Sequence, residues 1–277
     1  MKQVNNKEML EFLEKDLLRN FYNCDSIVNA GSENFGVKNI IFYTADGNPS
    51  DDYASFSENI VNELLVTILC SNESFISDVF NEIKKVKENF KLIRIGTDNL
   101  DLFETRTFKK NFKISKKYEA EYGVYACLSK DNIPQITYPS DVRFETVKNP
   151  KGTEYSGLDD KMWDGLSSQI KFGTDSDLLF AAFERENLCG YLLANSSYKN
   201  VYDISNVFVA EKFRGKKYGT YLTVFFADFC YRNGFIPHYG TAVSKYSERV
   251  ALNSGFEEVS RIHYADIKFK RKLLGSF

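Results

Sequence analysis

The strongest constraint on the fold of this chain is a junction of three successive segments near residue 210. Residues 204–209 form an apolar, strand-like run, and residues 220–231 form a longer apolar run of helical character. Between them lies a basic turn that contains the glycine-bearing sequence RGKKYG at residues 214–219. A strand that enters a helix through such a turn presents unpaired backbone N–H groups at the positive end of the helix dipole. The junction therefore predicts a site for a phosphate-like anion.

Length and charge narrow the classes of function. A chain of 277 residues predicts two domains or one large one. Its net charge of -2 and its pI of about 5.9 argue against a nucleic-acid-binding protein that relies on a broad basic surface. A local basic pocket for a phosphorylated cofactor stays compatible with this charge balance.

Cysteine usage and hydropathy predict a reduced, cytoplasmic protein without a membrane segment. The five cysteines are scattered, include no CxxC pair and are odd in number, which fits a disulfide framework poorly. The first residues lack the apolar core of a signal peptide, and no window holds the roughly 18 apolar residues of a membrane helix. The two histidines are too few for a His-rich metal site, so no metal is expected.

The first half of the chain predicts an N-terminal α/β domain, residues 1–133. Helices are expected at 7–22 and 75–90, with Ser74 as the N-cap of the second. Strands are expected at 39–43, 64–70, 91–96 and 121–128. This half contains no nucleotide-binding glycine-rich loop. Its role is therefore unknown, and part of an acceptor pocket or an interface are the two interpretations.

Residues 131–134, with Pro139 soon after, predict a linker to a second domain at residues 134–277. The apolar pattern of that domain predicts the order β-α-β-β-β-α-β-α-β. The elements are expected at 142–147, 161–170, 178–184, 188–194, 202–209, 219–233, 236–242, 246–254 and 258–269. The chain as a whole is thus expected to be of the α/β (α+β) class.

This order, and two motifs inside it, resemble the GCN5-related N-acetyltransferase (GNAT) family. The family's first motif, Arg/Gln-x-x-Gly-x-Gly/Ala at the start of a helix, is similar to residues 214–219. Its second motif, a strand, a polar turn and a short helix ending in Gly-Phe, is similar to residues 244–256. The resemblance covers residues 142–269 and implies a GNAT-like mixed sheet flanked by helices. The N-terminal domain would be smaller, and a degenerate copy of the same fold is one interpretation of it.

The resemblance implies acetyl-CoA as the cofactor and divides it between two parts of the junction. The pyrophosphate would lie on the turn, where glycines let the main chain approach closely. The pantetheine amides would pair with the edge of the preceding strand, and a backbone N–H there would stabilise the oxyanion. The residues expected to bind the cofactor are Val207, Phe208, Val209, Arg214, Gly215, Lys216, Lys217, Tyr218, Gly219, Ser244 and Ser247. For both serines, a role as helix N-cap is an equal interpretation.

Several positions depart from the family pattern. Lys217 replaces the middle glycine of the first motif, and lysine adopts a positive φ less readily than glycine. Ala251 stands where many members carry the tyrosine that protonates the departing thiolate. Ser205 and Asn206 stand where many members carry a carboxylate that acts as general base. The first departure bears on cofactor affinity, and the others leave the acid and the base open.

Other side chains near these positions are candidates for proton transfer. Asp203 and His238 are the candidate bases, each with a structural role as the alternative. Tyr246 is the candidate acid, with Tyr239 and Tyr264 as alternatives, and among 17 tyrosines a structural role is the favoured interpretation of each. Three aromatic residues could line an acceptor pocket: Trp163, Phe172 and Phe180. Core packing is the favoured interpretation of all three.

The sequence therefore predicts an acyl-CoA-dependent N-acetyltransferase that acts directly on an unidentified small-molecule amine. No nucleic-acid or membrane partner is expected, and a homo-oligomer is compatible with the sequence. The alternative is a non-catalytic CoA-binding or regulatory protein that kept the fold, as the departures at Ala251, Ser205 and Asn206 suggest. Aminoacyl transfer from tRNA is disfavoured by the acidic charge balance.

Overall fold

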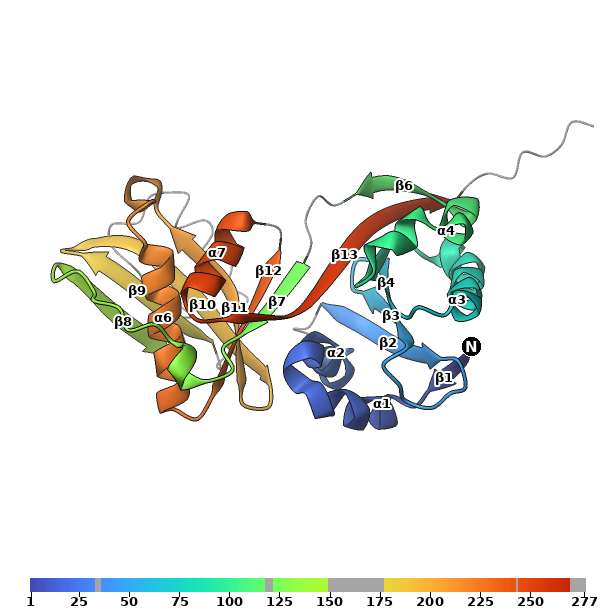
Figure 1. The fold of residues 1–277 in the computed structure, drawn as a ribbon, viewed down its shortest axis with the longest axis horizontal. Coiled ribbons are helices and arrows are strands. Elements are labelled where there is room, and N and C mark those ends of the chain that lie inside the picture. Colours follow the sequence, from blue (N-terminus) through green and yellow to red (C-terminus); the bar gives the residue numbers. More distant parts are fainter. Residues whose placement is uncertain (33–35, 118–121, 149–176, 243, 270–277) are drawn as a thin grey trace, which may run out of the picture. The chain divides into compact units, whose positions relative to one another are not determined.

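The computed structural model of the chain describes residues 1–32, 36–117, 122–148, 177–242 and 244–269 (Figure 1). Contacts divide the chain into two units, Met1–Tyr122 with Ser260–Phe277, and Gly123–Val259, so the last strand, β13 (Glu257–Phe269), contributes to both. The predicted linker lies within the second unit, where the Asn132 side chain donates to Glu257 and Ile133 packs against the core. The division into domains 1–133 and 134–277 stays a prediction.

The first unit is built on a sheet that is antiparallel except for one parallel pair. Its strands are β1 (Lys2–Val4), β2 (Val37–Thr44), β3 (Tyr53–Asn59), β4 (Glu63–Leu69), β5 (Leu92–Thr97) and β6 (Phe112–Lys117). Strands β1 to β4 pair antiparallel in sequence order, β4 pairs parallel with β5, and β13 pairs antiparallel with both β5 and β6. A parallel pair requires a crossover connection, which α3 (Glu73–Val86) supplies.

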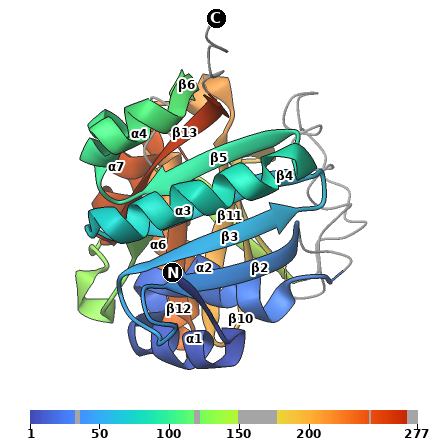
Figure 2. The same ribbon diagram turned by 90° about the vertical axis from the view of Figure 1, so that its right-hand side faces the viewer.

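The helices of this unit flank its sheet. α3 buries Phe75, Val79, Phe80 and Ile83 against apolar residues of β4 and β5, and Figure 2 shows it in front of the sheet, running in nearly the same direction as β5. α1 (Asn6–Leu13) and α2 (Leu17–Asn29) contact β2, and α4 (Arg106–Asn111) contacts α3. The amphipathic spacing of apolar residues along α3 is what commits one face of that helix to the sheet.

Three expectations for this unit change. The predicted helix 7–22 is two helices, because residues 14–16 form a 3-10 turn, and the second helix continues to Asn29. Ser74 as an N-cap is wrong: the Asn72 side chain accepts from the backbone N–H groups of Ser74 (3.0 Å) and Phe75 (3.2 Å), since asparagine caps as well as serine does. The sequence pattern also misses β3, in which the polar Ser55 is buried together with its apolar neighbours.

The second unit is a mixed sheet in the order β7-β12-β11-β10-β9-β8. Its strands are β7 (Tyr122–Ala126), β8 (Val142–Lys148), β9 (Leu178–Glu184), β10 (Asn187–Tyr198), β11 (Val201–Val209) and β12 (Ile236–Ala242). β8 to β11 pair antiparallel, whereas β11 and β12 pair parallel across the helix α6 (Tyr218–Arg232), and α7 (Lys245–Asn253) follows β12. These elements confirm the predicted order, except that helix 161–170, with Trp163 and Phe172, lies outside the described residues.

The core of the second unit forms where α6 packs on the sheet. Phe180 on β9 is fully buried, and its ring contacts those of Phe225, Phe226 and Phe229 on α6 at centroid distances of 6.0, 5.5 and 5.2 Å. Core packing, the favoured interpretation of Phe180, is therefore confirmed. α6 is apolar on most of its surface and packs firmly on the sheet. This packing sets the position of the turn that precedes the helix.

The two units share one order of elements. In each, three antiparallel strands are followed by a helix, a parallel strand and a short helix: β2-β3-β4-α3-β5-α4 and β9-β10-β11-α6-β12-α7. This shared order supports the interpretation of the first unit as a degenerate copy, which stays a prediction. No helix within the described ranges is long and apolar enough to cross a membrane. All five cysteines are described, and none forms a disulfide.

Candidate functional site

Strand β11 leaves its parallel neighbour halfway along its length. β11 pairs with β12 from Val201 to Ile204, whereas the pairs recorded for the remaining described residues of β11 are with β10 alone. The register of β10 shifts at this point: Leu193 pairs with Asn206 and Ala194 with Ile204, so that Ser205 is an extra, bulged residue. A bulge bends its strand. Among the described residues, the edge of β11 beyond Ser205 has no pairing partner on the side of β12.

This open edge contains the three residues expected to bind the pantetheine arm. Val207, Phe208 and Val209 are all half-buried, and the Phe208 ring stacks on Tyr191 at 5.6 Å. Gly190 lies opposite Val209, and a Cβ there would come within 2.5 Å of the Phe208 carbonyl oxygen. The edge thus offers backbone groups to an extended chain of amides, as a sheet edge does to an added strand.

The turn after β11 ends at an uncapped helix start. Gly215 (φ 82°) and Lys217 (φ 65°) both have left-handed backbones, and Lys217 occupies the N-cap position of α6 without a capping side-chain bond. The N–H of Tyr221 bonds to the carbonyl of Lys217 at 3.0 Å, which begins the helical hydrogen-bond ladder. The preceding N–H groups, of residues 218–220, have no intrahelical partner by position. They form an anion site of the kind expected from the sequence.

Lys217 adopts a backbone conformation that is strained for a lysine. A lysine in the left-handed region is less stable there by about 1 kcal/mol than in the right-handed one, yet the turn holds it at φ 65° and ψ 14°. The glycine-like conformation of the turn is therefore preserved without the glycine.

We predict that Lys217→Gly raises the free energy of unfolding by up to about 1 kcal/mol, because it removes this strain. If the ammonium makes no contact with the cofactor, acetyl-CoA also binds more tightly, which calorimetry measures. Lys217→Asn is the matched control, since asparagine tolerates the same conformation and also lacks the charge. Weaker binding by both variants would identify the lysine charge as a ligand.

The side chains of Lys216 and Arg214 in the turn make different contacts. Lys216 Nζ lies 3.1 Å from Glu184 Oε1, and the buried Tyr218 hydroxyl donates to the same oxygen at 2.9 Å. These two hydrogen bonds lower the pKa of Glu184. Arg214 donates through Nε to the carbonyl of Val209 at 3.2 Å and so braces the turn against β11. An arriving phosphate would compete with Glu184 for Lys216.

The second motif forms the short helix α7 beside β12. Ser244 is its N-cap and accepts from the backbone N–H groups of Tyr246 (3.2 Å) and Ser247 (3.4 Å), so the structural interpretation of Ser244 is confirmed. The Ser247 hydroxyl bonds instead to the hydroxyl of Tyr239 at 2.8 Å. Ala251 is fully buried and carries no proton donor. A direct role of either serine at the cofactor stays a prediction.

Asp203 and His238 come together just before the bulge. They are direct partners in the β11–β12 register, and Nδ1 of His238 lies 2.7 Å from Oδ1 of Asp203. The His238 side chain is 0% exposed and that of Asp203 13%. A carboxylate in this position favours the imidazole tautomer that carries its proton on Nδ1. The two candidate bases thus form a single dyad near the point where the strands separate.

The corresponding junction in the first unit lacks both features. There, β4 and β5 pair from Glu63 with Leu92 to Ile68 with Thr97, the last residue of β5. The start of α3 is capped by Asn72 and has Glu73 in its first turn, whereas α6 has neither a side-chain cap nor a first-turn acid. A capped, acidic helix start disfavours anions. Of the two strand–helix junctions, the second is the one suited to a phosphorylated ligand.

Comparison with known proteins agrees with this geometry. Residues 144–260 match the model of the acetyltransferase (GNAT) family. The chain contains a GNAT acetyltransferase domain. A search of curated proteins found no match in sequence.

Solved structures extend the similarity in fold to both units. A GCN5-related N-acetyltransferase from Sphaerobacter thermophilus has a TM-score of 0.57 at 12% identity, with 97% of this chain and 94% of that chain covered. A Drosophila protein has a TM-score of 0.56 at 14% identity, covering 96% and 97%. A tandem GNAT protein from the clavulanic acid biosynthesis pathway has a TM-score of 0.51 at 10% identity, covering 97% and 98%. At these identities the likeness concerns the fold.

The candidate acids of the GNAT domain lie in different surroundings. Tyr246, in the first turn of α7, is 82% exposed. Tyr239 is buried, and burial raises the pKa of its hydroxyl. Tyr264 pairs with Gly96 in the first unit, where burial raises its pKa to about 12. Tyr264 therefore belongs to the first unit, whereas Tyr239 and Tyr246 belong to the second.

Sequence reasoning did not single out Glu184 or the bulge at Ser205. Glu184 ends β9, far in sequence from the turn that it contacts through Lys216 and Tyr218. Ser205 carries an ordinary polar side chain whose hydroxyl donates to the Leu193 carbonyl at 3.2 Å. A bulge depends on the register between two strands, and no local residue pattern announces it.

Proposed function

We propose that the GNAT domain binds acetyl-CoA and transfers the acetyl group directly to the amine of a small molecule. The observation that carries this proposal is the open edge of β11 leading straight into the uncapped start of α6. An extended amide chain fits the first feature and a pyrophosphate the second. The scattered cysteines support a cytoplasmic location.

Each part of the junction would have a defined task. The N–H groups of residues 218–220 would receive the pyrophosphate, with a released Lys216 adding positive charge. Residues 207–209 would hold the pantetheine amides, and a backbone N–H of this edge would donate to the oxyanion that forms on the thioester carbonyl. Bound acetyl-CoA supplies the activated acyl group.

The dyad supplies a base in this proposal. The amine nitrogen attacks the thioester carbonyl carbon, and its proton passes through water to the Asp203–His238 dyad. Asp203 holds the imidazole in the competent tautomer and stabilises the imidazolium that forms. Collapse of the tetrahedral adduct forms the amide and breaks the bond to sulfur, and the thiolate takes a proton from Tyr246 or from water.

We predict that Asp203→Asn lowers kcat by about 100-fold, the lower end of the usual range for general base catalysis. The affinity for acetyl-CoA should stay within about twofold, because Asp203 lies outside the turn. The measurement is a pH profile of kcat/KM for both proteins. A parallel loss of stability with an unchanged profile would show that the dyad only ties β11 to β12.

Two assays test the function itself. Calorimetry with acetyl-CoA is expected to show one site per chain, and thiol release over a panel of polyamines, amino sugars and amino acids is expected to identify an acceptor. No binding at millimolar acetyl-CoA would overturn the proposal. The buried Ala251 favours one alternative, a non-catalytic CoA-binding protein. Tight binding without thiol release from any amine would establish it.

A further inference from the structure

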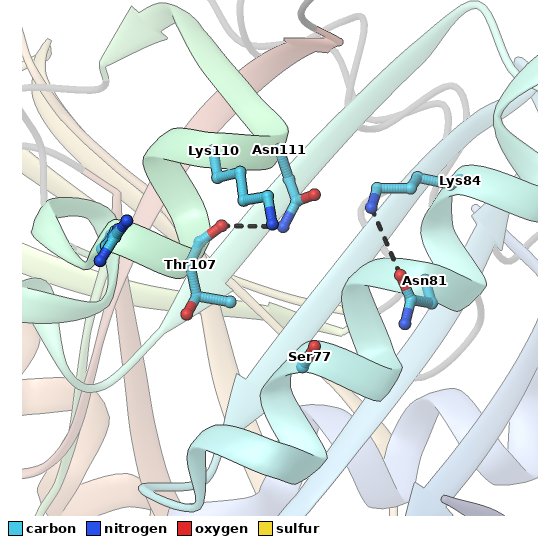
Figure 3. A pocket seen from close by; sticks show the side chains of 7 residues that line it. Ser77, Asn81, Lys84, Thr107, Lys110 and Asn111 are labelled. Atoms are coloured by element: carbon cyan, nitrogen blue, oxygen red, sulfur yellow. Dashed lines mark hydrogen bonds between the residues drawn. The ribbon is translucent and has the colours of Figure 1, made fainter.

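A polar cleft in the first unit lies outside the GNAT cofactor site. It measures about 410 Å³ and opens between helices α3 and α4 (Figure 3). The lining residues are Ser77, Asn81, Lys84, Arg106, Thr107, Lys110 and Asn111. Three of these are cations and none is an acid. The cleft therefore offers a concentrated positive charge and several neutral hydrogen-bonding groups.

The cations in the cleft differ from their neighbours in sequence. Lys85 and Lys109, which do not line it, pair with Glu82 at 2.8 Å and with Glu104 at 2.6 Å. Across the described ranges, Lys84 and Lys110 have no carboxylate within 4.0 Å, and Lys84 contacts only the neutral Asn81 at 3.3 Å. Within each lysine pair, one charge is neutralised and the other is left for a ligand.

Arg106 completes the group of unneutralised charges. It is exposed at the first residue of α4, and in the described part of the chain no carboxylate lies within 4.0 Å of it. Like charges around one cleft repel each other, and an anion would relieve this repulsion. The charge on this face is therefore better explained by a ligand than by the stability of the unit.

The two helices that line the cleft pack on each other through buried rings. Phe80 of α3 lies edge-to-face with Phe108 of α4 (5.9 Å) and with Phe112 (4.9 Å), and all three rings are buried. This packing fixes the separation of the two helices. On the wall, the Asn111 side chain donates to the Thr107 carbonyl at 2.8 Å (Figure 3). A ligand would consequently enter a preformed site.

We propose that this cleft binds a small, multiply charged anion, namely a phosphorylated metabolite. The lining matches phosphate groups, for which ammonium and guanidinium groups supply charge and serine, threonine and asparagine supply hydrogen bonds. The cleft has the volume of one small ligand. A nucleic acid would need basic charge beyond it, where Lys85 and Lys109 are already paired with acids.

The test uses inorganic pyrophosphate as the probe and the full chain, saturated with coenzyme A to cover the α6 junction. Calorimetry at low salt is expected to show one pyrophosphate site. Lys84→Gln/Lys110→Gln should weaken it at least about tenfold, because two charge-assisted contacts are lost. Lys85→Gln/Lys109→Gln, with the same change in net charge, should leave it within about twofold. Arg106→Gln is a second variant, and thermal unfolding checks that each protein folds.

Three results would overturn this proposal. They are no pyrophosphate binding to the parent protein, equal effects of the two double variants, and Lys84-dependent binding of a single-stranded RNA 12-mer that is tighter than that of pyrophosphate. The outcome is independent of the proposed acetyl transfer, since acetyl-CoA affinity is measured on the same variants. If the parent protein fails to bind acetyl-CoA, the comparison between the double variants still shows whether the cleft binds pyrophosphate.

Discussion

Gly255→Ala is expected to lower the free energy of unfolding by about 3 kcal/mol or more. Gly255 has φ +87°, and an added Cβ would lie 2.0 Å from the backbone carbonyl oxygen of Asn132. The left-handed conformation alone costs an alanine about 1–2 kcal/mol, and the collision is with backbone, which cannot rotate away. The turn after α7 and the segment around Asn132 would have to separate.

Gly234→Ala is the matched control for this prediction. Gly234 also has a positive φ of +75°, but an added Cβ there would meet nothing within 4 Å. Urea unfolding of both variants separates the conformational cost from the steric cost. We expect a loss of about 1 kcal/mol for Gly234→Ala. Equal losses for the two would mean that residues 131–133 do not pack against the turn in solution.

Sequence periodicity predicted the second unit well because its elements have strong local signals. β9 to β12 and α6 are long apolar runs bounded by polar turns, and their expected limits agree with the structure within one or two residues, apart from the end of β10. The first unit was predicted less well. β3 carries alternating serines, and the polar residues 14–16 interrupt a helix whose apolar spacing continues through them.

The site could be predicted in its residues but not in its geometry. The RGKKYG turn and the N-cap at Ser244 follow from local sequence. The pairing of Asp203 with His238 depends on the parallel register of two strands that are separated by α6. The contact of Glu184 with Lys216 depends on tertiary packing in the same way. The geometry of the site therefore depends on strand register and tertiary packing, which the local motif does not specify.

The backbone conformation of Lys217 could not be predicted from its residue type. Its residue type argued against a positive φ, yet the backbone adopts one. The turn is determined on both sides, by the 3-10 bonds of residues 210–214 before it and by the buried Tyr218 and Gly219 after it. Local preference of about 1 kcal/mol is smaller than the packing energy that fixes these flanks.

Thr220→Glu is expected to weaken acetyl-CoA binding by about 100-fold while leaving the fold intact. Residue 220 lies in the first turn of α6, where a carboxylate would repel a pyrophosphate with about 2–3 kcal/mol at short range. The same carboxylate interacts favourably with the helix dipole, so that the free energy of unfolding should rise by about 0.3–1 kcal/mol. The first unit already carries this arrangement, with Glu73 in the first turn of α3.

The expected fall in acetyl-CoA affinity and rise in the free energy of unfolding together distinguish a binding site from a structural turn. Calorimetry with acetyl-CoA and urea unfolding are measured on the same preparations, with Thr220→Gln as the neutral control of similar size. A protein that uses the start of α6 for the pyrophosphate loses affinity and gains stability in the glutamate variant only. Unchanged affinity in that variant would place the cofactor elsewhere and remove the main support for the proposed acetyl transfer. The electrostatic character of the effect predicts in addition that raised salt narrows the difference between the two variants.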